Sequence, residues 1–430
     1  MRFHVITLGC QMSAADGAET AAGLCRRGWQ ATEVPAQADA IVLTTCSVRD
    51  HAEQRALSLI GRLREWKAQD PRRLLVVAGC MAQRLGPRLA RRFPYVDLVV
   101  GARQAGRYAD IVAEALEKHP SASPSVMPKP AGPPRGPAVP SGGNAVQHLT
   151  IMRGCSCACS YCIVPSVRGS ESCRPVEEIL DEAHARIQNG ARELTLLGQR
   201  VNAYRSDGMD FPDLLRALDA LPGLRRLRFM SPHPTLCTDR LAAAIRECRT
   251  VCEWVHLPAQ SGCDRILGLM RRGYSRQQFL DTAERLRATV PDVVISTDII
   301  VGFPSETETD FTQTLTMLEE LRPATAFCFK YSARETTPAA ALADDVPAPV
   351  KEKRLAAVNA AVERLTRQAL DAQVGGIVEV LAETSTFGRT RTGFKTRWQS
   401  PAAAGDLISI RVNSATRRTL LGDINEPNTP

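Results

Sequence analysis

Four cysteines lie close together in the stretch RGCSCACSYC, which runs from Arg153 to Cys162 of this 430-residue chain. Three of them, Cys155, Cys159 and Cys162, have the spacing C-x3-C-x2-C. This spacing lets three thiolates from one loop converge on a single 4Fe-4S cluster. Ferredoxin clusters use four cysteines, so a cluster with three ligands keeps one iron open to a small molecule.

An open iron can bind the amino and carboxylate groups of S-adenosylmethionine, and the reduced cluster can then cleave that molecule to a 5'-deoxyadenosyl radical. The three cysteines therefore indicate radical chemistry. The alternative is a zinc site that uses all four cysteines, but the crowding C-x-C-x-C-x2-C fits paired zinc knuckles badly. Cys157, the fourth cysteine, is interpreted as a small loop residue with no ligand role.

Three dispersed cysteines near the N-terminus indicate a second site. Cys10, Cys46 and Cys80 each stand at the end of a predicted strand, in ITLGCQ, LTTCSV and VVAGCM. All strand carboxyl ends lie at one edge of a parallel sheet, so we expect these thiols to meet in space. They predict a second cluster with three thiolates and one open iron. The alternative for a single cysteine at a strand end is an ordinary core residue.

The composition favours a cytoplasmic protein with no membrane partner. The first residues have too short an apolar run for a secretory signal, and no apolar run of about 18 residues could span a bilayer. In that compartment clustered cysteines hold metal more often than they form disulfides. The formal net charge of +8 is compatible with a polyanionic partner. The other cysteines are interpreted as small buried hydrophobic residues: Cys25, Cys173, Cys237, Cys248, Cys252, Cys263 and Cys328.

Residues 1–118 must position the first three cysteines. Short apolar runs alternate there with helix-length segments such as Asp50–Gln69, which predicts a small parallel α/β domain. Its expected strands are Phe3–Leu8, Ala40–Thr45, Leu74–Ala78 and Val96–Val100. Residues 119–144 are rich in Pro, Gly and Ser and predict a linker.

Residues 145–372 resume the alternation with six strand-and-helix units, which predict a partial (β/α)6 barrel. The reactive loops of such a barrel follow the carboxyl ends of its strands. The expected strands are Leu149–Met152, Leu194–Leu197, Arg226–Met230, Trp254–Leu257, Val293–Ile300 and Ala326–Tyr331. The clearest expected helices are Val176–Gln188 and Lys351–Ala372. Residues 373–430 contain short strand patterns and predict a small all-β module.

The motifs resemble those of the radical-SAM methylthiotransferase family over essentially the whole chain. The matching stretches are TLGCQM (Thr7–Met12), TTCSVRDHAEQRA (Thr44–Ala56), AGCMAQR (Ala78–Arg84), RGCSCACSYCIVPSVRG (Arg153–Gly169), LLGQRVNAY (Leu196–Tyr204), HLPAQSG (His256–Gly262), STDIIVGFPSETE (Ser296–Glu308) and FKYSARETTPAA (Phe329–Ala340). The C-terminal module resembles a TRAM domain, with FGRTRTGFKTRW (Phe387–Trp398) as its basic loop.

The resemblance implies two 4Fe-4S clusters with different tasks. Cys155, Cys159 and Cys162 would bind the radical-SAM cluster, and the N-terminal three cysteines would hold an auxiliary cluster. S-adenosylmethionine would act twice, as methyl donor and as radical source. The implied product carries a methylthio group on carbon 2 of isopentenyladenosine at position 37 of tRNA. The implied partners are tRNA, an electron donor such as flavodoxin or ferredoxin, and a sulfur-supplying system.

Other residues are expected to bind the cofactor or the RNA. Tyr161, inside the cluster loop, is expected to pack near the nucleoside of S-adenosylmethionine. Gln199, after the second barrel strand, and Gly302, after the fifth, are further cofactor candidates, with ordinary barrel-rim structure as the alternative. Four cations of the TRAM-like module are expected to face RNA phosphates, with a solvated charged strand as the alternative: Arg389, Arg391, Lys395 and Arg397.

The chain departs from the usual family pattern at positions that flank the expected reaction chamber, including Ser13, Ala15, Ser166 and Arg200. Both cluster motifs stay whole, so these departures bear on the substrate more than on the chemistry. Alternative substrates are threonylcarbamoyladenosine in tRNA and an aspartate of a ribosomal protein, the latter disfavoured by the basic terminal module. An alternative of another class is a non-catalytic iron-sulfur protein that binds RNA.

Overall fold

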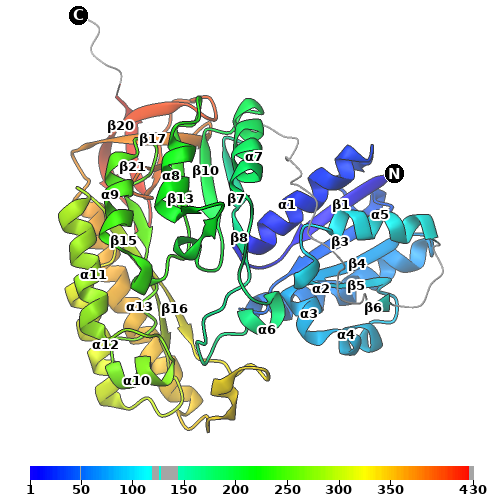
Figure 1. The fold of residues 1–430 in the computed structure, drawn as a ribbon, viewed down its shortest axis with the longest axis horizontal. Coiled ribbons are helices and arrows are strands. Elements are labelled where there is room, and N and C mark those ends of the chain that lie inside the picture. Colours follow the sequence, from blue (N-terminus) through cyan, green and yellow to red (C-terminus); the bar gives the residue numbers. More distant parts are fainter. Residues whose placement is uncertain (49, 119–124, 127–143, 426–430) are drawn as a thin grey trace, which may run out of the picture. The chain divides into compact units, whose positions relative to one another are not determined.

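The computed structural model describes residues 1–48, 50–118, 125–126 and 144–425, and its chain divides into two compact units (Figure 1). The first unit comprises the described residues of Met1–Gly142, Arg153–Cys157 and Cys162–Ser172. The second comprises those of Gly143–Met152, Ala158–Tyr161 and Cys173–Pro430. The predicted linker lies almost entirely outside the described residues. No described helix is long and apolar enough to cross a membrane.

Parallel strands form the sheet of the first unit, in the order β2-β1-β3-β4-β5-β6. They are β1 (Arg2–Thr7), β2 (Gln30–Ala31), β3 (Ala40–Thr45), β4 (Leu74–Gly79), β5 (Leu98–Gly101) and β6 (Ser125–Val126). β3 and β4 are buried along their whole length, as expected for apolar runs in a sheet covered on both faces. The prediction of a parallel α/β domain is confirmed.

Helices cover both faces of this sheet (Figure 1). They are α1 (Gln11–Arg26), α2 (Asp50–Gln69), α3 (Cys80–Leu85), α4 (Pro87–Arg92) and α5 (Tyr108–Lys118). Leu24 of α1 and Val112 of α5 pack against Val42 on one face. Ile60 of α2 and Leu89 of α4 pack on the opposite face. The core therefore lies above and below the sheet, and the strand ends stay free to carry functional side chains.

Two three-stranded parallel sheets form the centre of the second unit, in the orders β13-β10-β7 and β14-β15-β16. They contain β7 (Val146–Thr150), β10 (Glu193–Leu197), β13 (Arg226–Phe229), β14 (Trp254–His256), β15 (Val294–Val301) and β16 (Thr325–Lys330). A parallel bridge between Leu227 of β13 and Val251, just before β14, joins the two sheets. Six parallel strands in sequence order make the predicted partial barrel.

Helices between these strands cover the barrel. The helices of this region are α6 (Val164–Arg168), which belongs to the first unit, and α7 (Val176–Gln188), α8 (Phe211–Asp219), α9 (Asp239–Glu247), α10 (Asp264–Leu269), α11 (Arg276–Thr289), α12 (Glu308–Leu321) and α13 (Ala348–Asp371). The short strands are β8 (Met152–Arg153), β9 (Ser172–Cys173), β11 (Arg205–Ser206) and β12 (Met209–Asp210). The bounds of α7 agree with the prediction. α13 begins three residues earlier than expected, because Pro349 fits the first turn of a helix.

The first barrel strand differs from its prediction. Residues 149–152 were expected, whereas β7 begins at Val146 and pairs through Thr150 with β10. The reason is that the extended backbone from Val146 onward finds its hydrogen-bond partners in β10, although its side chains are less apolar than those of Leu149–Met152.

A closed barrel ends the described chain, with the strand order β17-β18-β19-β21-β20. Its strands are β17 (Ile377–Thr384), β18 (Phe387–Thr390), β19 (Lys395–Arg397), β20 (Leu407–Ala415) and β21 (Leu420–Ile424). Val380, Trp398 and Ile410 fill its interior. Buried Arg226 of β13 donates hydrogen bonds to the carbonyl oxygens of Arg389 and Glu379, at 2.6 and 3.1 Å. The small all-β module is confirmed and packs on the second unit's own sheet.

Candidate functional site

Cys10, Cys46 and Cys80 follow β1, β3 and β4, which are neighbours in the first unit's sheet. Two glycines let these strand ends approach one another. A Cβ atom on Gly9 would lie 2.3 Å from the Cβ of Cys46, and a Cβ on Gly79 would lie 2.4 Å from a backbone oxygen of the strand before Cys46. Both glycines have positive φ angles, which side chains disfavour. The glycine before Cys10 and the glycine before Cys80 therefore bring the cysteine segments together.

The three thiols differ in how readily they lose a proton. A hydrogen bond from the Cys46 thiol lowers the pKa of Cys10 to about 5, against the opposing effect of burial. The same bond, together with burial, raises the pKa of Cys46, and burial raises the pKa of Cys80. A 4Fe-4S cluster binds thiolates, so the predicted cluster would require Cys46 and Cys80 to lose their protons.

Helix α6, which begins two residues after Cys162, covers Cys80 within the first unit. Ile163 and Val167 pack with Cys80 and Ala102 in one buried apolar cluster. At the end of α6, Arg168 Nε donates a hydrogen bond to Cys80 Sγ at 3.3 Å. The segment that follows the second cysteine motif thus completes the surroundings of the first.

Two carboxylates and two arginines form a buried network beside this site. Arg168 Nη2 donates to Asp16 Oδ2 at 2.8 Å, and Arg153 pairs with both Asp16 and Glu19. The side chain of Asp16 is 1% exposed, and the two guanidinium charges keep its pKa below the usual value despite burial. The charges of the four groups balance, as buried ions require.

Backbone hydrogen bonds hold the start of the second motif. Cys155 N donates to Gly169 O at 3.0 Å, and the backbone N–H of Cys157 donates to Cys155 Sγ at 3.4 Å. A hydrogen bond from the Cys157 side chain lowers the pKa of Cys155 against the opposing effect of burial, and the backbone N–H of Cys157 adds to this lowering. Cys155 and Cys162 belong to the first unit, whereas Cys159 belongs to the second.

Within the second unit, Cys159 has its own buried arginine. Arg272 Nη1 donates to Cys159 Sγ at 3.3 Å and to the Tyr161 hydroxyl at 3.2 Å. Arg272 Nε donates to Tyr274 Oη at 2.9 Å, which fixes the guanidinium plane. The structure therefore joins the predicted ligand Cys159 to the predicted cofactor residue Tyr161 through one cation.

No group of three or more His, Cys, Asp or Glu side chains among the described residues has the geometry to hold a metal ion. The two cysteine sets are therefore not arranged around one ion. A 4Fe-4S cluster makes a different demand, because each cysteine binds a different iron.

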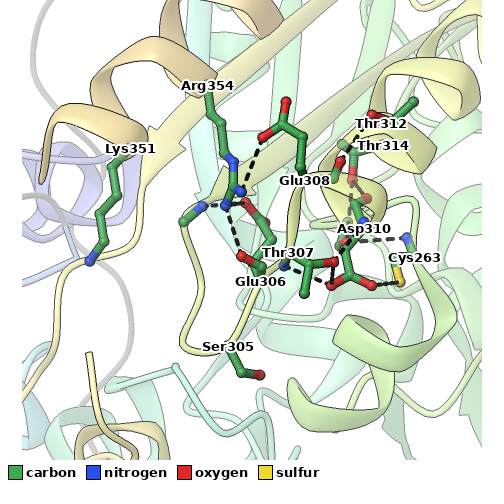
Figure 2. A network of polar contacts seen from close by, with 12 residues as sticks. Cys263, Ser305, Glu306, Thr307, Glu308, Asp310, Thr312, Thr314, Lys351 and Arg354 are labelled. Atoms are coloured by element: carbon green, nitrogen blue, oxygen red, sulfur yellow. Dashed lines mark hydrogen bonds and ion pairs between the residues drawn. The ribbon is translucent and has the colours of Figure 1, made fainter. Parts of the chain in front are cut away.

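The predicted cofactor residues Tyr161 and Gly302 border one apolar cluster of the second unit. The Tyr161 ring packs against a cluster that contains Phe303, the residue after Gly302. Gly302 N donates to Glu306 Oε1 at 2.9 Å, and Arg354 Nη1 holds the same oxygen at 2.8 Å. Figure 2 shows Arg354 between Glu306 and Glu308, beside the network in which Asp310 contacts Cys263. The loop at Gly302 is thus rigidly braced.

Gln199, the third predicted cofactor residue, follows β10. Its Oε1 atom is buried and has no hydrogen-bond partner among the described residues. A buried amide oxygen without a donor costs free energy, so this atom is available to a bound donor group.

The four predicted RNA-facing cations divide into two sets. Lys395 and Arg397 of β19 are exposed on either side of buried Thr396, as the alternation predicts. Arg389 of β18 pairs in register with Lys395, and its guanidinium forms an ion pair with Glu383 within the barrel. Arg391 is engaged inside the second unit, where its guanidinium binds Glu253 at 2.7 Å and the Val251 carbonyl at 2.7 Å.

Sequence reasoning missed Arg168, Arg272, Asp16 and the Glu306–Arg354 pair. Arg168 and Glu306 stand in the quoted motifs VPSVRG and GFPSETE, so their motif position was the available signal. Arg272 carried no such signal, since its contact with Cys159 spans 113 positions.

Comparisons with known proteins agree with the two-part organisation. Residues 2–101 match the model described as uncharacterized protein family UPF0004, and residues 149–318 match the radical SAM superfamily. The chain is 41% identical over 437 residues to the tRNA-2-methylthio-N(6)-dimethylallyladenosine synthase of Syntrophobacter fumaroxidans, covering 98% of this chain and 95% of the relative. It is 38% identical over 431 residues to the synthase of that name from Geobacter metallireducens, covering 98% of each.

Among solved structures, the radical S-adenosylmethionine methyltransferase TsrM from Kitasatospora setae matches with a TM-score of 0.56 and 13% identity, covering 79% of this chain and 77% of that chain. At this identity the likeness shows the fold alone. The parallel barrel and its C-x3-C-x2-C loop define a radical-SAM enzyme. More particularly, the chain belongs to the radical-SAM methylthiotransferase family, whose cofactors are S-adenosylmethionine and 4Fe-4S clusters.

Proposed function

We propose that this protein adds a methylthio group to carbon 2 of isopentenyladenosine at position 37 of tRNA. The observation that carries the proposal is the near-complete coverage of relatives bearing that activity in their names, at 41% identity for one of them. Both cysteine sets lie within the part of the chain that these relatives cover. tRNA is the proposed partner, and its modification would take place in the cytoplasm.

The residues around the first cysteine set fit a cluster. Cys10, Cys46 and Cys80 follow neighbouring parallel strands of one sheet, and two buried polar atoms beside them, Ser47 Oγ and Arg168 Nη1, have no hydrogen-bond partner among the described residues. Both atoms can donate a hydrogen bond, and the sulfide and thiolate sulfurs of a cluster can accept it. We therefore assign these three cysteines to the auxiliary 4Fe-4S cluster.

We assign Cys155, Cys159 and Cys162 to the radical-SAM cluster. When bound, this cluster supplies the electron that cleaves S-adenosylmethionine to a carbon radical, which an unreactive aromatic C–H bond requires. The chain's own residues orient the site: Arg272 fixes Cys159 and Tyr161, and the Glu306–Arg354 pair fixes the loop at Gly302. Tyr161, Gln199 and Gly302 are the proposed binding residues for S-adenosylmethionine.

We assign the RNA-facing surface to Phe387, Arg389, Lys395 and Arg397. Phe387 lies opposite Arg397 in the strand register, and the guanidiniums of Arg389 and Arg397 lie 5.6 and 5.8 Å from its ring centroid. An aromatic ring among cations suits an unpaired RNA segment, because bases stack on rings and phosphates pair with cations. Arg391 has a structural partner in Glu253 and serves to hold the barrel.

An electron donor such as flavodoxin or ferredoxin and a sulfur-supplying system complete the proposed reaction. The test is nucleoside mass spectrometry of bulk tRNA from a host that lacks its own methylthiotransferases, with and without this protein. A methylthio gain on isopentenyladenosine is expected. The variant Cys10→Ala should abolish the gain, whereas Cys237→Ala, at a buried cysteine outside both sets, should preserve it.

Other outcomes of this experiment identify the alternatives. A gain on threonylcarbamoyladenosine would move the protein to that branch of the family. The absence of any gain, combined with formation of 5'-deoxyadenosine by the purified protein, would indicate another target such as a ribosomal protein. The absence of both products would support the non-catalytic alternative.

A further inference from the structure

We propose that Arg168 is a positioning residue of the auxiliary cluster, which hydrogen-bonds the Cys80 sulfur with one N–H group and offers a second N–H group to a cluster sulfur. This inference rests on the proposed function, because it takes Cys80 as a cluster ligand. It adds a part of the chain outside the N-terminal sheet to the environment of that cluster.

The geometry of Arg168 supports this role. Its side chain is 3% exposed, and its Nε lies 3.3 Å from Cys80 Sγ while its Nη2 lies 2.8 Å from Asp16 Oδ2. A guanidinium presents donors along two edges of a rigid plane, so fixing one edge on a carboxylate aims the other. Lysine has a single charged point and could not hold both partners in this way.

The third nitrogen of the same guanidinium supports the role of Arg168 independently of these two contacts. Arg168 Nη1 is buried and has no hydrogen-bond acceptor among the described residues. A buried charged donor without an acceptor destabilises the folded protein, because its lost hydration is not replaced. The auxiliary cluster would bring sulfide sulfurs beside Cys80, and these are acceptors for Nη1.

Asp16 makes this arrangement rigid. Its carboxylate binds Arg168 through one oxygen and Arg153 through the other, and Arg153 also binds Glu19 at 2.7 Å. Two positive and two negative groups balance, which keeps the Arg168 guanidinium in place, and Arg168 acts on Cys80 through both its positive charge and its oriented hydrogen bond. Hydrogen bonds to cluster sulfurs stabilise the reduced, more negative state and raise the reduction potential.

The placement of Arg168 in the chain gives the contact a second consequence. Arg168 ends α6, and α6 begins two residues after Cys162 of the other motif. The hydrogen bond to Cys80 and the apolar contacts of Ile163 and Val167 hold this segment over the auxiliary site. Binding of the auxiliary cluster and the position of the segment after Cys162 are therefore linked.

The test is an EPR-monitored redox titration of the full-length chain that carries Cys155→Ala, Cys159→Ala and Cys162→Ala, so that only the auxiliary cluster is present. Arg168→Met in this background should lower the midpoint potential. We expect a change of about tenfold in the reduction equilibrium, which equals about 59 mV for one electron. Arg168→Lys, which keeps a charge for Asp16, should give a smaller shift in the same direction and covers the case in which the methionine variant does not fold.

The matched control is Arg186→Met in the same background. Arg186 is also a buried arginine paired with a carboxylate, Glu182, but it lies in the second unit on α7. Its loss should leave the midpoint potential unchanged. A wild-type potential in both Arg168 variants would overturn the inference while leaving the cluster assignment intact. If the background protein holds no iron at all, the ligand assignment fails, and the inference fails with it.

Discussion

Arg168 Nε and Cys80 Sγ lie 3.3 Å apart, although 88 positions separate the two residues in the chain. A second contact of the same kind joins Arg272 and Cys159 in the second unit, also at 3.3 Å. Each predicted cluster therefore has one thiol that accepts a hydrogen bond from a buried guanidinium. A thiolate ligand gains from a charge-assisted donor, because such bonds are stronger than neutral ones.

The iron content tests the choice of ligands. The anaerobically reconstituted protein should hold about eight irons per chain, since each cluster contains four. Cys157→Ala should keep this content, because Cys157 is not one of the proposed ligands and the variant retains the backbone N–H that donates to Cys155 Sγ. Cys159→Ala should reduce the content to about four irons. Loss of iron in the Cys157 variant would show that the loop binds its cluster with a different set of cysteines.

Arg272→Met should slow the reductive cleavage of S-adenosylmethionine. The substitution removes the donors that hold Cys159 and Tyr161, and a hydrogen bond to a charged group is worth about 1.5–3 kcal/mol, which corresponds to about tenfold or more. The measurement is the rate of 5'-deoxyadenosine formation, normalised to iron. Arg216→Met, which breaks the ion pair of a partly exposed arginine with Glu247, is the control. Equal rates in the two variants would argue against a role for Arg272.

Topology explains how much of the site the sequence could predict. Cys10, Cys46 and Cys80 could be grouped because parallel strands end at one sheet edge, and that rule needs only strand positions. Helices α2 and α7 have the predicted bounds because their apolar residues recur at helical spacing. Both inferences use local patterns together with a general rule of folds.

Arginine partners could not be predicted in the same way. Lys and Arg together make up 54 residues, and no local pattern predicts which thiol Arg168 or Arg272 contacts. Their contacts depend on tertiary packing. Arg391 shows a related limit. The alternation of cations predicts one shared face only if all four residues lie in one continuous strand. The chain turns at Gly393 between β18 and β19, so Arg391 lies in the turn and binds Glu253.

Arg228→Met should destabilise the second unit. The buried Arg228 pairs with buried Glu193 at 3.0 Å and donates to the carbonyl oxygens of Thr390 and Arg391 in the terminal barrel. Removal of one partner of a buried pair leaves an uncompensated charge and costs about 3–5 kcal/mol. Urea denaturation measures the free energy of unfolding. Arg240→Met, at an exposed ion pair, should cost no more than about 1 kcal/mol.

The free energy of unfolding should decrease as the pH decreases, because His233 takes up a proton on unfolding. Burial lowers the pKa of His233 from 6.5 to about 3, with help from the charges of Arg272 and Arg200. Between these values the unfolded chain binds more protons than the folded protein, so the free energy of unfolding decreases as the pH decreases. His233→Gln should show a weaker loss of stability from about pH 7 to about pH 4 in urea denaturation. The exposed His184→Gln variant should follow the wild type, and identical slopes for all three proteins would contradict the assignment.

The basic face of the terminal barrel should bind tRNA through its phosphates. Lys395→Gln and Arg397→Gln should each weaken binding and reduce the slope of log K against log salt by about one phosphate contact. Arg364→Gln provides the matched loss of one positive charge, because Arg364 pairs with Glu319 on helices outside the barrel. The salt dependence separates a direct phosphate contact from a general effect of net charge: a general effect would change all three variants alike, whereas a contact surface on β19 would change only the first two.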